Sequence, residues 1–278
     1  MGEIQYQPLR SLIYVDCVKE EYRHKLQHWL YYYHVPESMA KFEPWVTKYA
    51  FYNALPMPPK GEQFGTYRMQ LTEHYWMVNP MSEESLVNSL NEYFPLDAMK
   101  WQGTIPDDDA EGFMADGEAA RSSGGGNGCP PFIMAFLPIF WEEDLKGKGR
   151  TMQDGPNYRW QFLISYPDGH KEDGDAWMRE EVLPAFAKMP QVTRIMTSKV
   201  KKEINNCHMD RCVEMWFDGP ADWYECAVNL AKDIARPDWA VEEEFPYVKS
   251  RFQFASLFLA DMPTSDNLRQ YRGYLPMR

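Results

Sequence analysis

The 278-residue sequence lacks the paired cysteines and long apolar runs that mark several large classes of protein. Its five cysteines are odd in number and no two stand at C-x-x-C spacing, so we expect a reducing, cytoplasmic environment. The longest apolar run, Phe132–Trp141, is about half of what a membrane span needs, and the first residues show no signal peptide. We therefore expect no membrane insertion.

Basic clusters and common cofactor motifs are also missing. The formal net charge is -12, which repels the phosphate backbone of nucleic acids, and the one basic run at 199–203 is short. The sequence has no G-x-G-x-x-G after a strand, no P-loop and no G-x-S-x-G. Nucleic acid, nicotinamide cofactors, nucleoside triphosphates and serine hydrolase chemistry therefore lose their usual support.

Aromatic residues, in contrast, are abundant. They make up 15% of the chain, with 10 Trp, 17 Tyr and 15 Phe. So many rings indicate an aromatic core or a pocket lined by rings.

Secondary-structure patterns occur in the same order twice. In the first half we expect strands at 11–16, 46–53, 66–76 and 132–141, and helices at 20–34 (ended by Pro36) and 82–93. In the second half we expect strands at 159–166, 191–199, 212–217 and 251–260, and helices at 175–188 and 221–235. Residues 102–131 are acidic and then rich in Gly and Ser, which is typical of a flexible insertion, either a plain surface segment or a lid.

The two halves also match residue by residue. The matches in chain order are Trp29 with Trp177, Pro36 with Pro184, 44–48 (PWVTK) with 190–194 (PQVTR), and Trp76 with Trp216. We predict an α+β protein of two fused ferredoxin-like β-α-β-β-α-β units, one over 1–145 and one over 155–278. Each unit would leave one sheet face bare, so the two sheets should pack face to face as a barrel.

The segment YYYHVPESMAKFEPWVTKYAFYNAL at 31–55 resembles the EthD-like branch of the dimeric α+β barrel superfamily, with His34, Val35 and Pro36 at its H-x-P motif. The resemblance implies acid–base chemistry on aromatic or polyketide-like molecules, with His34 as catalyst, and it makes a homodimer plausible. The second half has Val182 where the histidine would stand. We therefore expect a cofactor-independent lyase (a dehydratase, deformylase or cyclase) acting on a largely apolar aromatic small molecule.

The candidate site residues surround this motif. His34 would transfer the proton, although a histidine that caps a helix end is the plainer interpretation. Strand alternation places Arg68, Gln70, Thr72, His74 and Trp76 on one polar face, which could line a ligand cavity or face solvent. The opposite face is apolar except for Glu73. The expected catalytic set is His34, His74, Tyr32, Tyr33 and Asp16, the last as a residue that orients a histidine; the expected substrate-binding set is Trp29, Tyr31, Tyr52, Arg68 and Trp76.

Two alternatives involve a cofactor. His24 and His28 have the i, i+4 spacing of a metal site, but no third ligand is evident and a solvated helix face explains them. Haem enzymes of the superfamily take a proximal histidine, usually from the C-terminal half, where only His170 and His208 stand. We predict no metal and no cofactor, with a non-catalytic protein that binds an aromatic ligand, or a haem or metal oxidoreductase, as alternatives.

Overall fold

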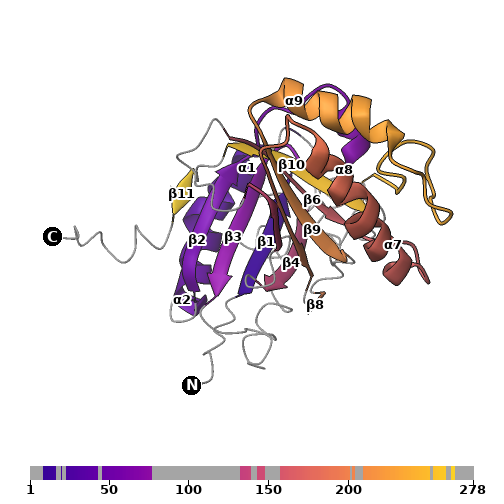
Figure 1. Cartoon of the computed structure of the whole chain (residues 1–278). Coiled ribbons are helices and arrows are strands. Elements are labelled where there is room, and N and C mark those ends of the chain that lie inside the picture. Colours follow the sequence, from indigo (N-terminus) through magenta and orange to yellow (C-terminus); the bar gives the residue numbers. More distant parts are fainter. Residues whose placement is uncertain are drawn as a thin grey trace, which may run out of the picture.

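The computed structural model describes residues 9–16, 20, 23–42, 46–76, 132–138, 143–147, 157–200, 202–203, 209–250, 253–260 and 264–266. These residues form two antiparallel β-sheets with helices on their outer sides (Figure 1). The helix expected at 82–93, the insertion at 102–131 and His208 lie outside the described residues.

Both sheets have the ferredoxin-like strand order. The first contains β1 (Leu9–Val15), β2 (Val46–Asn53), β3 (Gln70–Trp76) and β4 (Phe132–Pro138), in the order β2-β3-β1-β4. The second contains β6 (Tyr158–Ile164), β7 (Arg194–Lys199), β9 (Arg211–Phe217) and β10 (Phe254–Ala260), in the order β10-β6-β9-β7. The predicted α+β class and the duplicated sheet topology are confirmed.

Proline does not end the first helix, contrary to the prediction. The chain runs without a break through α1 (Arg23–Trp29), the π-helix η2 (Leu30–His34) and α2 (Val35–Phe42). The second unit repeats this with α7 (Lys171–Trp177), η7 (Met178–Val182) and α8 (Leu183–Lys188). A proline lacks an N–H and is tolerated in the first turn of a helix. Because a π-helical turn stands just before Pro36, that residue lies in the first turn of a new α-helical segment.

Helices cover the outer face of the second sheet. They are α7 to α8 and the run of α9 (Pro220–Tyr224), η8 (Glu225–Leu230) and η9 (Ala231–Asp233) (Figure 1). Trp160 of β6 and Trp223 of α9 are fully buried between them, with ring centroids 5.8 Å apart. Many of the aromatic side chains of the chain lie in this core. The removal of their apolar surface from water is therefore the main stabilising contribution of the core.

The two sheets pack face to face and meet at both edges. A buried cluster that includes Leu12 and Leu71 of the first sheet and Leu163 and Leu257 of the second lies between them. At the edges β4 lies next to β7, and β2 next to β10. This is the arrangement of a dimeric α+β barrel, with both units in one chain.

The two units exchange segments. Residues 54–69 of the first unit cross to the second, where the Leu55 N–H donates to the Phe258 carbonyl and the Tyr67 N–H to the Ser256 carbonyl, each at 2.7 Å. The expected strand at 66–76 therefore begins only at Gln70, because Thr66 bridges to Ser256. Three short strands make further exchanges: β8 (Lys202–Glu203) pairs with β4, β5 (Glu143–Lys146) with β7, and β11 (Ser265–Asp266) with β2.

Phe64 holds the crossing segment in place. It is completely buried, and its ring centroid lies 5.4 Å from those of Trp160 and of Trp223 in the second unit. We expect Phe64→Ala to lower the free energy of unfolding by about 3–5 kcal/mol, because it leaves a cavity in a core that cannot close around it. Urea unfolding followed by tryptophan fluorescence measures this loss.

A matched control lies on the same segment. Met57 is 40% exposed, so Met57→Ala should change the free energy of unfolding by less than about 0.5 kcal/mol. A Phe64→Ala variant as stable as this control would show that the segment does not hold the units together.

The pairing of the strands shows which residues of the two units are equivalent. Arg10 lies opposite Tyr75, and Arg159 lies opposite Trp216 in the same way. Tyr75 is therefore the equivalent of Trp216, and the predicted match of Trp76 with Trp216 is wrong by one residue. A shift of one residue turns a strand side chain to the other face of the sheet, so this correction decides which residues face inward.

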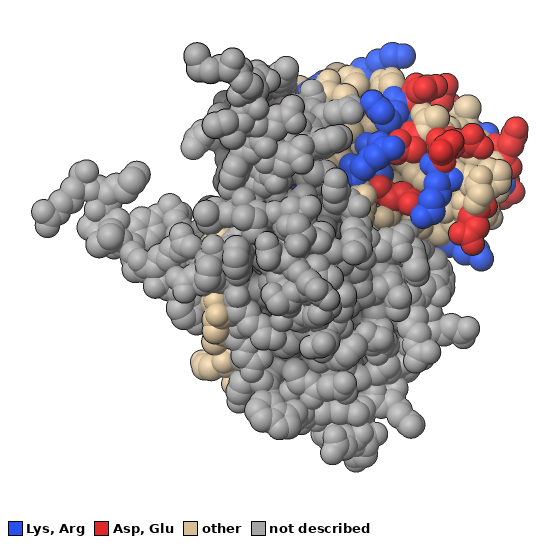
Figure 2. Space-filling model, turned by 90° about the horizontal axis from the view of Figure 1, so that it is seen from below, with Lys and Arg blue, Asp and Glu red and all other residues tan. Residues whose placement is uncertain are grey.

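Among the described helices, none combines the length and apolar character needed to cross a membrane. On the part of the surface coloured in Figure 2, Lys and Arg lie among Asp and Glu, on the side of the molecule where α7 lies in Figure 1. Charges of both signs are therefore interspersed on this part of the surface.

Candidate functional site

The faces that the two sheets turn toward each other carry a buried network of charges. Arg10 donates to Glu214 across the interface, and Nη2 of Arg159 donates to Glu214 at 2.6 Å and to Glu73 at 2.9 Å. All four side chains are at most 5% exposed. Equivalent strand positions supply the two arginines, and likewise the two glutamates. The network therefore links the two units by ion pairs between equivalent positions. It also explains why the charged Glu73 stands on an otherwise apolar face.

The carboxylates of this network remain ionised. Burial by itself would raise the pKa of Glu73, but the neighbouring cations, first Arg159 and then Arg10, outweigh it and lower the pKa to about 2. Burial likewise acts to raise the pKa of Glu214, but the charges of Arg10 and Arg159 outweigh it, so the pKa is lowered. A carboxylate held in this form accepts hydrogen bonds and is a poor proton donor near neutral pH. The network therefore suits pairing of the units better than proton transfer.

The opposite, outer face of the first sheet is polar and buried. Gln70, Thr72 and His74 alternate along β3, and Ser11 of β1 stands opposite His74; all four are at most 4% exposed. Burial of these residues excludes the interpretation as a solvent-exposed face, and the lining of a ligand cavity stays a prediction. We call these four residues the polar floor.

Aromatic rings of β2 adjoin the polar floor. The ring of Tyr49 meets that of His74 edge to face at 4.3 Å, and Tyr49 also contacts Phe51. Tyr31 of η2 packs on Phe51 with centroids 5.2 Å apart. This contact places η2, whose last residue is His34, against the same side of the sheet as the polar floor. The side chain of His34 itself lies outside the described residues, as do those of Trp29, Tyr33 and Trp76.

The other predicted residues fall into separate places. Tyr52 faces inward, where Nζ of Lys48 donates to its hydroxyl at 2.6 Å. Asp16 is buried and pairs with Arg68 at 3.5 Å, so two predicted residues meet, but on the inner side of β1 and away from His74. Asp16 therefore has a cation beside it, and its expected role of orienting a histidine stays a prediction.

Tyr32 lies at the surface. Its side chain is 71% exposed and its ring stacks on that of His28 at 4.5 Å. A hydroxyl in water stabilises a developing negative charge weakly compared with one in a closed site. The catalytic role expected of Tyr32 stays a prediction, and a buried group would stabilise such a charge better than this exposed hydroxyl.

The histidines named for metal or haem are exposed where the structure describes them. His24 and His28 are exposed on α1, and Nδ1 of His170 lies 3.5 Å from Asp173 at the start of α7. Within the described part of the chain, no group of three or more His, Cys, Asp or Glu side chains is placed to hold a metal ion.

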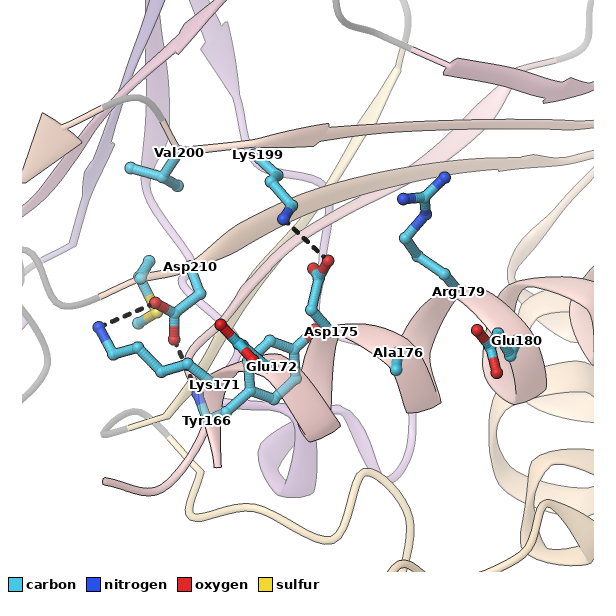
Figure 3. A pocket seen from close by; sticks show the side chains of 11 residues that line it. Tyr166, Lys171, Glu172, Asp175, Ala176, Arg179, Glu180, Lys199, Val200 and Asp210 are labelled. Atoms are coloured by element: carbon cyan, nitrogen blue, oxygen red, sulfur yellow. Dashed lines mark hydrogen bonds and ion pairs between the residues drawn. The ribbon is translucent and has the colours of Figure 1, made fainter. Parts of the chain in front are cut away.

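A polar pocket, of about 860 Å³, lies in the second unit between α7, the end of β7 and the start of β9 (Figure 3). Several charged side chains in or beside it are paired: Lys171 with Asp210 at 3.1 Å, Lys199 with Asp175 at 3.1 Å, and Arg211 with Asp175 at 2.7 Å. Ion pairs within the protein therefore neutralise part of the charge around this pocket.

Ser11 and the inner network were missed by the sequence reasoning. Ser11 is a single small polar residue in an apolar strand, which is easily taken for a neutral position. Arg159 and Glu214 are each an isolated charge within an apolar strand, and Arg10 precedes one. Comparison of the two halves at the corrected register would have found all of them, because the charges recur at equivalent positions and the serine does not.

Three comparisons relate the chain to known proteins. Residues 6–107, less than half of the chain, match the family model described as the chalcone isomerase N-terminal domain. A search of curated sequences finds no match. Among solved structures, the chain is similar to an anthrone oxidase-like protein at 10% identity and a TM-score of 0.43, with 93% of this chain and 92% of that chain covered. It is also similar to a variant of the chlorite dismutase from Candidatus Nitrospira defluvii, at 9% identity and a TM-score of 0.41, with 95% and 94% covered. At these scores the two structures support no inference about activity.

Proposed function

We propose that the protein is a cofactor-independent enzyme that isomerises a chalcone-type substrate, an aromatic enone that carries a phenolic hydroxyl. The match of residues 6–107 to the chalcone isomerase N-terminal domain carries this proposal, because that range includes His34 and the whole polar floor. Closing a ring by adding the phenol to the enone double bond is an addition within one molecule. It therefore belongs to the cyclase-type lyase chemistry that the sequence predicts.

In the proposed mechanism His34 takes the proton of the phenol, and the phenolate oxygen forms a bond to the β-carbon of the enone. The carbonyl oxygen becomes an enolate, which accepts hydrogen bonds from the polar floor. A proton returned to the α-carbon completes an isomerisation in which no atom is gained or lost. The imidazole suits both proton transfers because its unperturbed pKa lies near neutrality.

The second unit supports the placement of His34. Val182 stands at its position in the repeat, as the last residue of η7, and is completely buried in the core against β6 and β9. Leu30, the first residue of η2, is buried like its equivalent Met178, and Tyr31 packs on Phe51. We propose that His34, the last residue of η2, supplies the proton-transfer group of this site. The EthD-like identity of the H-x-P motif and a homodimeric state stay predictions.

The test is a conversion assay with 2′-hydroxychalcone. We expect the absorbance of the conjugated enone to fall faster with enzyme than without it, and a product of unchanged mass to appear in chromatography. Binding without conversion would favour the ligand-binding alternative. A product heavier by one oxygen, or a Soret band in the optical spectrum of the purified protein, would favour an oxidoreductase and contradict the proposal.

A further inference from the structure

The outer faces of the two sheets differ at equivalent positions. Ser11 stands opposite His74 in the first unit, and Trp160 stands opposite Met215 at the same place in the second. Trp160 and Met215 are completely buried in the aromatic core under α8 and α9. The first unit therefore has a small polar pair where its copy has two of the bulky apolar side chains that fill the core.

The next positions along the strands show the same exchange. Thr72 of β3 lies opposite the second residue after Ser11, and Val213 of β9 lies opposite the second residue after Trp160. Thr72 therefore corresponds to Val213. Threonine and valine have nearly the same shape, so threonine at this position adds a hydroxyl without improving the packing. A buried polar group costs free energy unless it has a hydrogen-bond partner. Packing alone therefore does not account for the polar floor.

Gln70 gives an independent indication of a ligand. It is completely buried, its Nε2 donates to the Thr72 hydroxyl at 3.2 Å, and its Oε1 has no partner among the described residues. Its equivalent, Arg211, is satisfied by Asp175 at 2.7 Å and by Thr197 at 3.0 Å. A buried polar atom without a partner needs an explanation, and a bound hydrogen-bonding molecule supplies one.

We infer that the polar floor is the specificity-determining surface of the site, and that each chain has one such site. Ser11, Gln70, Thr72 and His74 would hydrogen-bond the hydroxyl and carbonyl groups of a hydroxylated aromatic ligand, while Tyr49 and Phe51 contact its ring. The second unit has no site of this kind because Trp160 and Met215 occupy the corresponding space. The inference rests on the proposed function for its choice of ligand.

The test replaces two residues of the polar floor by the residues at the equivalent positions of the second unit. In the full chain, Thr72→Val and His74→Met are combined, and binding of 2′-hydroxychalcone and of unsubstituted chalcone is measured by calorimetry and tryptophan quenching. We expect wild type to bind one 2′-hydroxychalcone per chain in preference to chalcone. The double variant should bind 2′-hydroxychalcone about tenfold or more weakly and lose the preference, because the hydrogen-bond partners are gone. Met215→Leu, at the equivalent position of the second unit, is the control and should leave both affinities unchanged.

The outcomes separate this inference from the proposed function. Binding that depends on the polar floor without any conversion would support the inference and contradict the isomerase. A double variant that keeps its affinity and preference while wild type converts the substrate would overturn the inference alone. Two binding sites per chain would also overturn it, and an absence of all binding would overturn both. Ser11→Trp offers a second test, because the indole should fill the site and abolish binding in a chain that remains folded by circular dichroism.

Discussion

A His34→Ala variant is expected to lose turnover of 2′-hydroxychalcone by a factor of about 10²–10⁴ while its unfolding midpoint stays near that of wild type. The size of the loss is what general acid–base catalysis by one side chain supplies. The equivalent position in the second unit is Val182, so the fold itself does not require a histidine there. Initial rates measured from pH 5 to pH 9 should also lose the titration near neutrality that an imidazole gives to the wild-type rate.

His170→Ala is the matched control for this experiment. His170 is a histidine at the start of the equivalent helix in the second unit, and its side chain is 46% exposed. Its removal should leave the rate unchanged. A His34→Ala variant with a near-normal rate and an unchanged pH profile would show that His34 takes no part in the mechanism.

Replacing Arg159 by methionine is expected to lower the free energy of unfolding by about 3–5 kcal/mol, because it removes a cation that two buried carboxylates share. Arg159 donates to both glutamates, at 2.9 Å to Glu73 and at 2.6 Å to Glu214. Methionine keeps most of the volume of the side chain, so the loss measures charge rather than a cavity. Urea unfolding at neutral pH provides the measurement.

A second substitution tests this explanation. Combining Arg159→Met with Glu73→Leu removes one carboxylate together with its cation and leaves Arg10 paired with Glu214. Lys48, another partner of Glu73, is 27% exposed and can turn to solvent. The double variant should therefore be more stable than Arg159→Met alone. If instead the two losses simply add, the buried charges do not act as one network.

The order of strands could be predicted because strand-like and helix-like segments occur in the same order in both halves of the chain. The segments that join the two units could not. β8 and β11 have two residues each, too few for any periodicity, and Thr66 and Tyr67 read as the start of a strand whose partner lies in the other unit. The helix end was misplaced because proline forbids an interior helical position but not the first turn after a π-helical segment.

The candidate site was predictable in part. The alternation of Gln70, Thr72 and His74 gives the polar face from sequence alone, but alternation cannot say whether a face is covered by helices or by water. Asp16, at the end of the first strand, was expected to orient a histidine of the site, and Tyr52 was expected to contact the substrate. Strand parity assigns both to the inner side, where their partners are Arg68 and Lys48. A correct face for each strand, rather than proximity in sequence, would have separated the two groups.

The exchange of segments between the units affects how the chain is made. Synthesis proceeds from the first unit to the second, so Phe64 leaves the ribosome before Trp160 and Trp223, the rings that enclose it, exist. The edge of β4 must likewise wait for Lys202 and Glu203. During that interval the first unit presents an exposed phenylalanine and an open strand edge, which are the features that promote association with other chains. We therefore expect the nascent first unit to be the stage at which this chain associates most readily with other chains.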